Sequence, residues 1–79
     1  MKGALRLDPA RLGAVIRAIR MSRNISIRAV ALKAGCTPQN ISNVESGKNL
    51  PSVPTLVAIC EAINVPIDTI MDCIRDQRA

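Results

Sequence analysis

The stretch Ile25–Gly47, ISIRAVALKAGCTPQNISNVESG, decides the fold, because it predicts two short helices joined by a tight turn. Ser26 is a good N-cap for the first helix. Apolar residues then follow at the spacing of one helical face: Ile27, Val30, Ala31 and Ala34. Gly35 ends this helix, since glycine adopts a left-handed backbone at little cost.

The second helix of this stretch has an unusual outward face. Thr37 caps it, and Pro38 occupies its first turn, where a missing N–H costs nothing. Ile41 and Val44 turn one side inward, and Gly47 ends the helix. The outward side carries Gln39, Asn40, Ser42, Asn43 and Ser46. This is a neutral, hydrogen-bonding surface, unlike the mixture of Lys and Glu on an ordinary solvated helix.

Three further helices are predicted from similar signals. Asp8 caps the first with Pro9 at its first position, and Ser52 caps the fourth. Asn24, a residue type that tolerates positive φ, and Asn64 mark helix ends. The predicted helices are residues 9–22, 26–34, 38–46, 53–63 and 67–76, after a loose arm at 1–7. We therefore expect one all-α domain over residues 1–79, a compact five-helix bundle that contains a helix-turn-helix.

The composition supports small helices. The 79 residues are 48% hydrophobic but include no Phe, Trp or Tyr, so the core must consist of Ile, Val, Leu, Ala and Met. No apolar run approaches the ~18 residues of a membrane span, and the N-terminus lacks the apolar core of a signal peptide. The sequence therefore predicts a cytoplasmic protein without a membrane partner.

Charge is distributed unevenly. Residues 1–60 hold nine Lys and Arg against only Asp8 and Glu45, whereas residues 61–79 hold two Arg against four acids. A basic body with a slightly acidic end suggests that one part meets a polyanion. Plain solubility is the alternative explanation, and the asymmetry alone does not exclude it.

The cysteines indicate neither a metal site nor redox chemistry. Cys36, Cys60 and Cys73 are odd in number and far apart, without a CxxC pair or any His. We interpret them as free thiols that act as small buried hydrophobes. Without His, clustered carboxylates or a Gly-rich phosphate loop, an enzyme is a poor hypothesis. No cofactor, metal or small-molecule ligand is predicted.

Together these motifs resemble the lambda-repressor-like (phage repressor and Cro, XRE-type) helix-turn-helix family, from about Leu12 to Ile70. The motifs are Ile16-Arg17-x-x-Arg20, Ser26-x-x-x-Val30-Ala31-x-x-Ala34-Gly35, Ile41-Ser42-x-Val44-Glu45-x-Gly47 and Pro51-Ser52-x-x-Thr55-Leu56-x-x-Ile59-Cys60-x-Ala62-Ile63-x-Val65. In this order and spacing they are highly specific. The resemblance implies that the third helix lies in the DNA major groove while the second crosses the phosphate backbone.

The resemblance also implies roles for individual residues. It assigns base reading to Thr37, Pro38, Gln39, Asn40 and Asn43. Amide chemistry favours the last three, because Gln and Asn can pair with adenine N6 and N7. Phosphate contacts are expected from Arg17, Arg28, Ser42, Lys48 and Asn49. Ile27 replaces the polar residue usual in the family, which shifts the phosphate contact toward Arg28. Arg20 and Glu45 are expected to form a structural ion pair that sets the tilt of the third helix.

The leading hypothesis is a transcriptional regulator, in the simplest case a repressor, that binds a two-fold symmetric operator as a homodimer. Such a protein would be bacterial or phage-encoded and would associate with the nucleoid. The expected dimer interface consists of Ile67, Ile70, Met71 and Ile74, although these residues could instead only close the core. The alternative function is an antitoxin-like or adaptor module that binds another protein and has weak, salt-insensitive DNA affinity.

Overall fold

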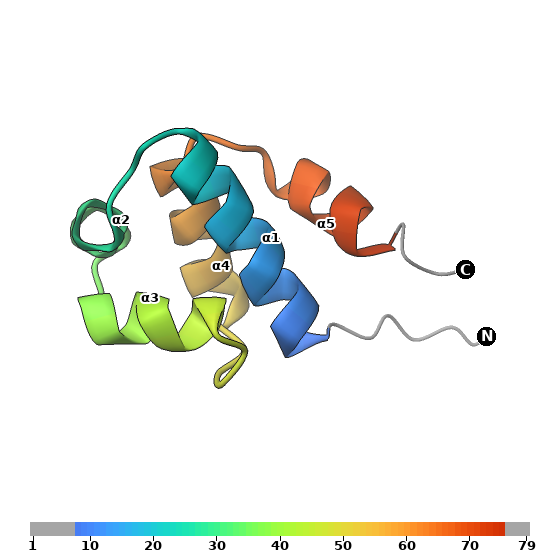
Figure 1. Ribbon diagram of the computed structural model, residues 1–79, viewed down its shortest axis with the longest axis horizontal. Helices are drawn as coiled ribbons and strands as arrows, with labels where there is room; N and C mark the ends of the chain where they lie inside the picture. Colours follow the sequence, from blue (N-terminus) through green and yellow to red (C-terminus); the bar gives the residue numbers. More distant parts are fainter. Residues whose placement is uncertain (1–7, 76–79) are drawn as a thin grey trace.

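A computed structural model describes residues 8–75, which form five α-helices around one core (Figure 1). The helices are α1 (Pro9–Ser22), α2 (Ile27–Ala34), α3 (Pro38–Glu45), α4 (Val53–Ala62) and α5 (Ile67–Arg75). Their bounds lie within one residue of the predicted ones, and the all-α five-helix prediction is confirmed. The predicted arm at 1–7 and the last predicted helical residue, 76, lie outside the described residues.

Local side-chain chemistry starts four of the helices. In each, a side-chain oxygen of the N-cap residue accepts a hydrogen bond from a backbone N–H in the first turn. The pairs are Asp8 with Ala10 at 3.1 Å, Ser26 with Ala29 at 3.0 Å, Thr37 with Asn40 at 3.1 Å and Ser52 with Thr55 at 3.4 Å. A cap of this kind stabilises a helix by about 1 kcal/mol. Four of the five predicted helix starts therefore coincide with a local capping bond.

Left-handed backbone ends four of the helices. Gly35 has φ 75° at the C-cap of α2, while Asn24, Gly47 and Asn64 have φ 56°, 84° and 61° just after the C-caps of α1, α3 and α4. Asparagine tolerates this conformation better than most residues with a side chain. The Arg23 guanidinium, at the end of α1, also donates a hydrogen bond of 3.1 Å to the Asn64 carbonyl. This bond links the turn after α1 to the turn after α4, although Arg23 and Asn64 are 41 residues apart in the sequence.

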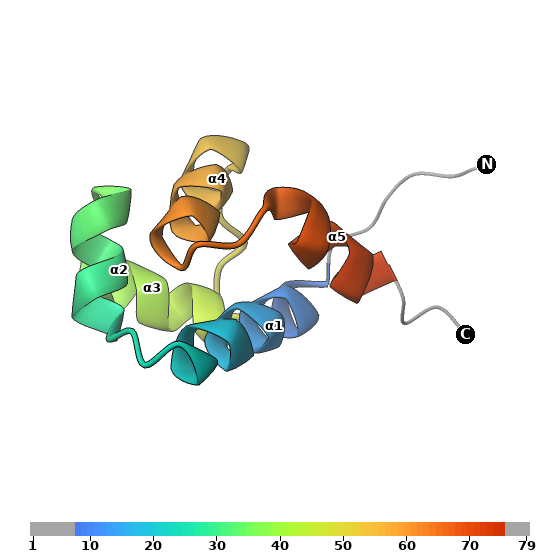
Figure 2. The same cartoon turned by 90° about the horizontal axis from the view of Figure 1, so that it is seen from above.

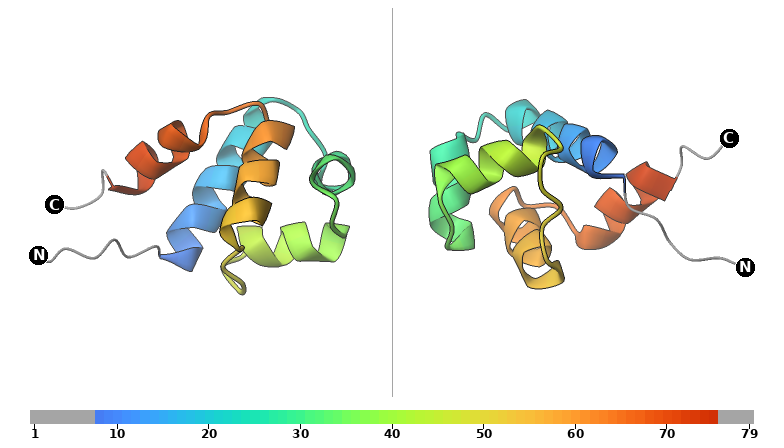
Figure 3. Two further views of the ribbon diagram at one scale, coloured as in Figure 1. Left: turned by 180° about the vertical axis from the view of Figure 1, so that it is seen from behind. Right: turned by 90° about the horizontal axis from the view of Figure 1, so that it is seen from below.

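The helices are arranged so that α2 and α5 lie at opposite ends of the molecule (Figures 1 and 2). α2 packs on α3 and α4, α1 packs on α3 and α5, and α4 packs on α5. Seen from below, α3 crosses the near side of the molecule without another helix in front of it (Figure 3, right). This arrangement leaves one side of α3 open to solvent.

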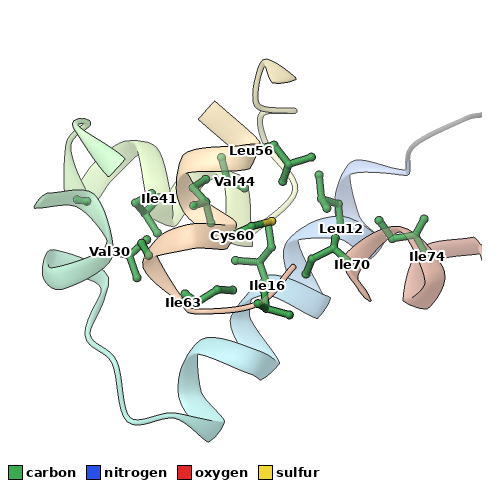
Figure 4. Close-up of a cluster of buried hydrophobic side chains, with 14 residues drawn as sticks. Leu12, Ile16, Val30, Ile41, Val44, Leu56, Cys60, Ile63, Ile70 and Ile74 are labelled. Atoms are coloured by element: carbon green, nitrogen blue, oxygen red, sulfur yellow. The ribbon is translucent and has the colours of Figure 1, made fainter. Parts of the chain in front are cut away.

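The core is aliphatic apart from one thiol (Figure 4). It consists of Leu12, Ile16, Val30, Ala31, Ile41, Val44, Leu56, Ile59, Cys60, Ala62, Ile63, Val65, Ile70 and Ile74. Among the described residues no polar or charged one is buried. Full burial of a Val, Leu or Ile side chain stabilises the fold by about 1.5–3 kcal/mol, so this cluster supplies most of the driving force.

The three cysteines are free thiols in different environments. Cys60 lies in the core, where burial and, secondarily, the Glu61 carboxylate raise the pKa of its thiol. Cys36 is half-buried in the turn between α2 and α3. Cys73 is exposed on α5, so the prediction of a buried thiol is wrong at this position. Its place on the polar side of an amphipathic helix explains the difference.

Gly13 permits the close approach of α1 to α3. A methyl group added at this buried residue would lie 2.5 Å from the Glu45 carbonyl oxygen and closer still to that of Val44. Both obstacles are backbone atoms, which cannot rotate away as a flexible side chain would. Since α1 rests directly on the last turn of α3, the orientation of α3 depends on this glycine.

We expect Gly13→Ala to destabilise the protein by about 1–3 kcal/mol, because the added methyl group overpacks the contact between α1 and α3. Inside an unobstructed helix the same change would stabilise by about 0.5–1 kcal/mol. Urea unfolding followed by circular dichroism measures the difference. The control is Ala14→Gly at the exposed neighbouring position, which should cost only the usual helix propensity. A rise in stability of Gly13→Ala would show that the close contact is absent.

Candidate nucleic-acid interface

The polar side of α3 faces solvent, as the sequence predicts. Ile41 and Val44 are 0% and 5% exposed and attach the helix to the core. The predicted base-reading residues lie on the opposite side: Thr37, Pro38, Gln39 and Asn40 are exposed and Asn43 is half-buried. We call Gln39, Asn40 and Asn43 the amide ridge. Its three side chains carry both donors and acceptors of hydrogen bonds, as base edges do.

Two members of the amide ridge are hydrogen-bonded to each other. The Gln39 side chain donates from Nε2 to Oδ1 of Asn43 over 3.0 Å. The two residues are four apart in a helix, which places their side chains one above the other on the same face. Two of the three amides of the ridge are therefore paired with each other in the protein without a ligand.

The end of α3 positions the loop that follows it. The Asn43 carbonyl accepts hydrogen bonds from the backbone N–H groups of Lys48 at 2.9 Å and Asn49 at 3.3 Å, and from the Ser46 hydroxyl at 3.2 Å. Lys48 and Asn49, both predicted to contact phosphate, are exposed immediately beside the helix. Together with Asn40 they line a shallow groove of about 430 Å³. The structure thus brings a predicted base reader and two predicted phosphate contacts together.

The other predicted phosphate contacts lie on three helices. Arg28 is exposed in the first turn of α2 and shares a second groove with Pro38 at the start of α3. Ser42 is exposed on α3 itself. Arg17 is exposed on α1, where its Nε donates to the Met21 sulfur over 3.4 Å, and it lines neither groove. Arg28 therefore lies beside the start of α3 and Ser42 on α3 itself, while Arg17 lies on α1 outside both grooves.

Arg20 and Glu45 form an ion pair that joins α1 to the last residue of α3. The Arg20 guanidinium donates from Nε to Glu45 Oε2 at 2.6 Å and from Nη2 to Oε1 at 3.1 Å. A third donor, Nη1, reaches the Ile25 carbonyl at 2.8 Å. The side chains are only 11% and 6% exposed. This two-point geometry is the one that fixes direction as well as distance, so it restrains the tilt of α3.

The four residues predicted for a dimer interface separate into two pairs on α5. Ile70 and Ile74 are 0% and 7% exposed and belong to the core together with Leu12 (Figure 4). Ile67 and Met71 are half-buried and pack against the edge of the core. Contact with a second chain on this helix would therefore depend on Ile67 and Met71, since the other two side chains are already enclosed.

Within residues 8–75 there is no group of three or more His, Cys, Asp or Glu that could hold a metal ion. No single helix in that range is long and apolar enough to cross a membrane. α4 and α5 meet this test only when they are combined, and the chain bends by 107° between them.

Removing one partner of this ion pair should be costly, because both side chains are almost enclosed. We expect Arg20→Met to destabilise the fold by about 3–5 kcal/mol, because the Glu45 carboxylate would lose its compensating charge. The double variant Arg20→Met/Glu45→Met should lose less than the sum of the two single variants, since it leaves no isolated charge. Urea unfolding of the unmodified protein, Arg20→Met, Glu45→Met and the double variant completes the double-mutant cycle. The control Arg11→Met, at an exposed position of α1, should change stability by about 0.5 kcal/mol or less. Strictly additive effects would contradict a direct Arg20–Glu45 interaction.

Comparison with known proteins identifies similar sequences. A profile of the helix-turn-helix family matches residues 16–70 of the chain. The transcriptional regulator ClgR of Mycobacterium tuberculosis is 33% identical over 60 residues, which make up 76% of this chain and 54% of that protein. The chain thus spans about half the length of the curated relatives it matches.

Solved structures show the same fold. The clp gene regulator ClgR from C. glutamicum matches with a TM-score of 0.83 and 23% identity, over 95% of this chain and 97% of that one. The restriction-modification controller protein C.AhdI from Aeromonas hydrophila matches with a TM-score of 0.76 and 19% identity, over 80% and 96% of the two chains. At these identities the similarity concerns the fold. The profile covers most of the chain, so the protein belongs to the helix-turn-helix family, in its lambda-repressor-like, XRE-type branch.

Proposed function

We propose that this protein is a sequence-specific transcriptional regulator that inserts α3 into the major groove of duplex DNA. The observation that carries the proposal is the amide ridge, which α3 presents to solvent while Ile41 and Val44 attach the helix to the core. A major groove admits an α-helix, and Gln and Asn side chains on it can distinguish base pairs by paired hydrogen bonds. Family membership and the names of the regulators it resembles support the same function.

Positive charge supports an approach to the phosphate backbone. Arg28 and Lys48 are exposed on either side of α3, on α2 and on the following loop. The backbone N–H groups at the starts of α2 and α3 add the positive ends of two helix dipoles. Ser42 and Asn49 supply neutral donors, and Arg17 a further charge. We assign phosphate contacts to these residues and base contacts to the amide ridge, with Thr37 and Pro38 at its N-terminal end.

We further propose that two copies bind a two-fold symmetric operator. One domain of this size reads only a few base pairs, so useful selectivity needs a second copy about one helical turn away. Ile67 and Met71 on α5 supply the apolar surface for this contact, with Ile70 and Ile74 behind them. In the simplest mechanism the dimer represses transcription in the cytoplasm of a bacterium by blocking access of the polymerase to nucleoid DNA.

The dependence of DNA affinity on salt tests the proposed phosphate contacts. We expect a plot of log Kd against log salt concentration to be linear, because each neutralised phosphate releases counterions. Arg28→Ala should lower the slope by about one and leave the preferred sequence unchanged. Fluorescence anisotropy with a duplex selected from random DNA measures both quantities. Thr69→Ala, at an exposed position of α5, is the control. Weak binding without salt dependence would contradict the proposal and favour a module that binds another protein.

Sedimentation equilibrium tests the proposed dimer. At high micromolar concentration the free protein should sediment with about twice the mass of the 8.5 kDa chain. Met71→Lys should shift the equilibrium toward the monomer, because it places a charge in the apolar contact. Thr69→Lys on the exposed side of the same helix should have no such effect. A clean monomer in the unmodified protein at this concentration would exclude dimerisation through α5.

A further inference from the structure

The hydrogen bond between Gln39 and Asn43 gives these two amides unequal roles. We propose that Gln39 reads an adenine in the major groove, and that Asn43 acts first as the positioning residue that holds Gln39 in the reading orientation. This inference rests on the proposed function and assigns one base of the recognised sequence. It replaces three equivalent amide readers by a coupled pair, Gln39 with Asn43, and an independent reader, Asn40.

The hydrogen-bonding groups of Gln39 that stay free limit the base that it can read. Its Nε2 carries two protons, and Asn43 takes one of them in the 3.0 Å bond. One N–H and the Oε1 acceptor remain. Adenine presents a complementary pair in the major groove, an acceptor at N7 and a donor at N6. Guanine presents two acceptors there, so it leaves Oε1 of Gln39 without a partner. The free groups of Gln39 therefore match adenine.

Asn43 keeps both of its donors. Its Oδ1 accepts the bond from Gln39, which occupies one of the two lone pairs of that oxygen and leaves both protons on Nδ2. A pairing with adenine would use the same oxygen a second time, so we assign adenine to Gln39 and donation to Asn43. Guanine, with acceptors at both N7 and O6, is a base edge that accepts such donation.

Burial explains why Asn43 positions Gln39 and not the reverse. Asn43 is half-buried, which restricts the movement of its short side chain. Gln39 is exposed and has a longer, more flexible side chain. Fixing such a side chain before binding removes part of the entropy that association would otherwise cost. The anchored residue therefore orders the mobile one.

Asn40 is the member of the amide ridge that lies outside the Gln39–Asn43 bond. It is exposed on α3, and its backbone N–H donates to the Thr37 hydroxyl, which caps the helix. Asn40 lines the groove with Lys48 and Asn49, which neither Gln39 nor Asn43 lines, and it takes no part in the Gln39–Asn43 bond. We therefore expect Asn40 to read its base independently of Asn43.

The test begins with a duplex that the unmodified protein selects from random DNA. Gln39→Ala locates the base pair that Gln39 reads, because preference is lost there. Four duplexes that differ only at that pair then measure adenine discrimination, expected to be roughly 5- to 150-fold in the unmodified protein. Asn43→Ala should abolish most of this preference, although Gln39 is still present. Adding Gln39→Ala to it should cause little further loss of the preference.

Asn43→Asp separates positioning from direct reading. The carboxylate still accepts the Gln39 proton but has none to donate, so adenine discrimination should survive while overall affinity falls. Asn40→Ala combined with Asn43→Ala should give additive losses. Thermal melting of each variant should match that of the unmodified protein, because the structural bonds of Asn43 use its backbone carbonyl.

Two results would contradict the proposed coupling of Gln39 and Asn43 but leave the proposed function in place. Full adenine preference in Asn43→Ala would show that Gln39 needs no support. Equal loss in Asn43→Asp and Asn43→Ala would show that Asn43 is the donor of the bond. An unmodified protein that enriches no sequence would instead overturn the proposed function and this assignment with it.

Discussion

Where α1 crosses the C-terminal end of α3, successive turns of α1 contact the segment that ends the helix. Ala10 lies against Gly47, Gly13 lies against the carbonyl groups of Val44 and Glu45, and the Arg20 guanidinium holds the Glu45 carboxylate. These contacts combine close packing with a two-point hydrogen bond, so they resist both translation and rotation. The exposed side of α3 carries only side chains that contribute little to stability. The orientation of α3 therefore depends on the contacts of its inner side, and those with α1 fix its C-terminal end.

The basic and acidic residues that are unevenly distributed in the sequence also lie on different helices of the fold. The basic residues Arg28 and Lys48 flank α3, whereas Asp68 and Asp72 are exposed on α5. α5 lies at the end of the molecule opposite α2 (Figures 1 and 2). The basic residues beside α3 therefore attract a polyanion to that helix more strongly than the acidic side of α5 does. Such a field would orient the molecule during its approach to DNA, before any base contact forms.

Local chemistry explains why so much of the fold can be predicted from the sequence. Capping side chains such as Ser26 and Thr37 act within three residues, and the left-handed turn at Gly35 is a property of a single residue. Apolar spacing likewise identifies the inward sides of Ile41 and Val44. The same locality applies to the candidate site, because all three amides of the ridge lie within one short helix.

The features that escaped prediction depend on contacts between distant segments. No local pattern indicates that Gly13 touches α3 or that Arg23 reaches Asn64. An amphipathic pattern on α5 does not say whether its apolar side closes this core or meets a second chain, and in the fold Ile70 serves the core. The Gln39–Asn43 bond is different, since its spacing of four residues was visible in the sequence and is a sign of helical side-chain pairing.

The central claim is that amides on α3 probe base edges in the major groove. Its most direct test is the affinity for a selected duplex in which every purine carries carbon in place of N7. This change removes a major-groove acceptor and leaves base pairing and the minor-groove edges in place. The account predicts that affinity falls to the level of an unrelated duplex. Unchanged affinity for the substituted duplex would contradict it.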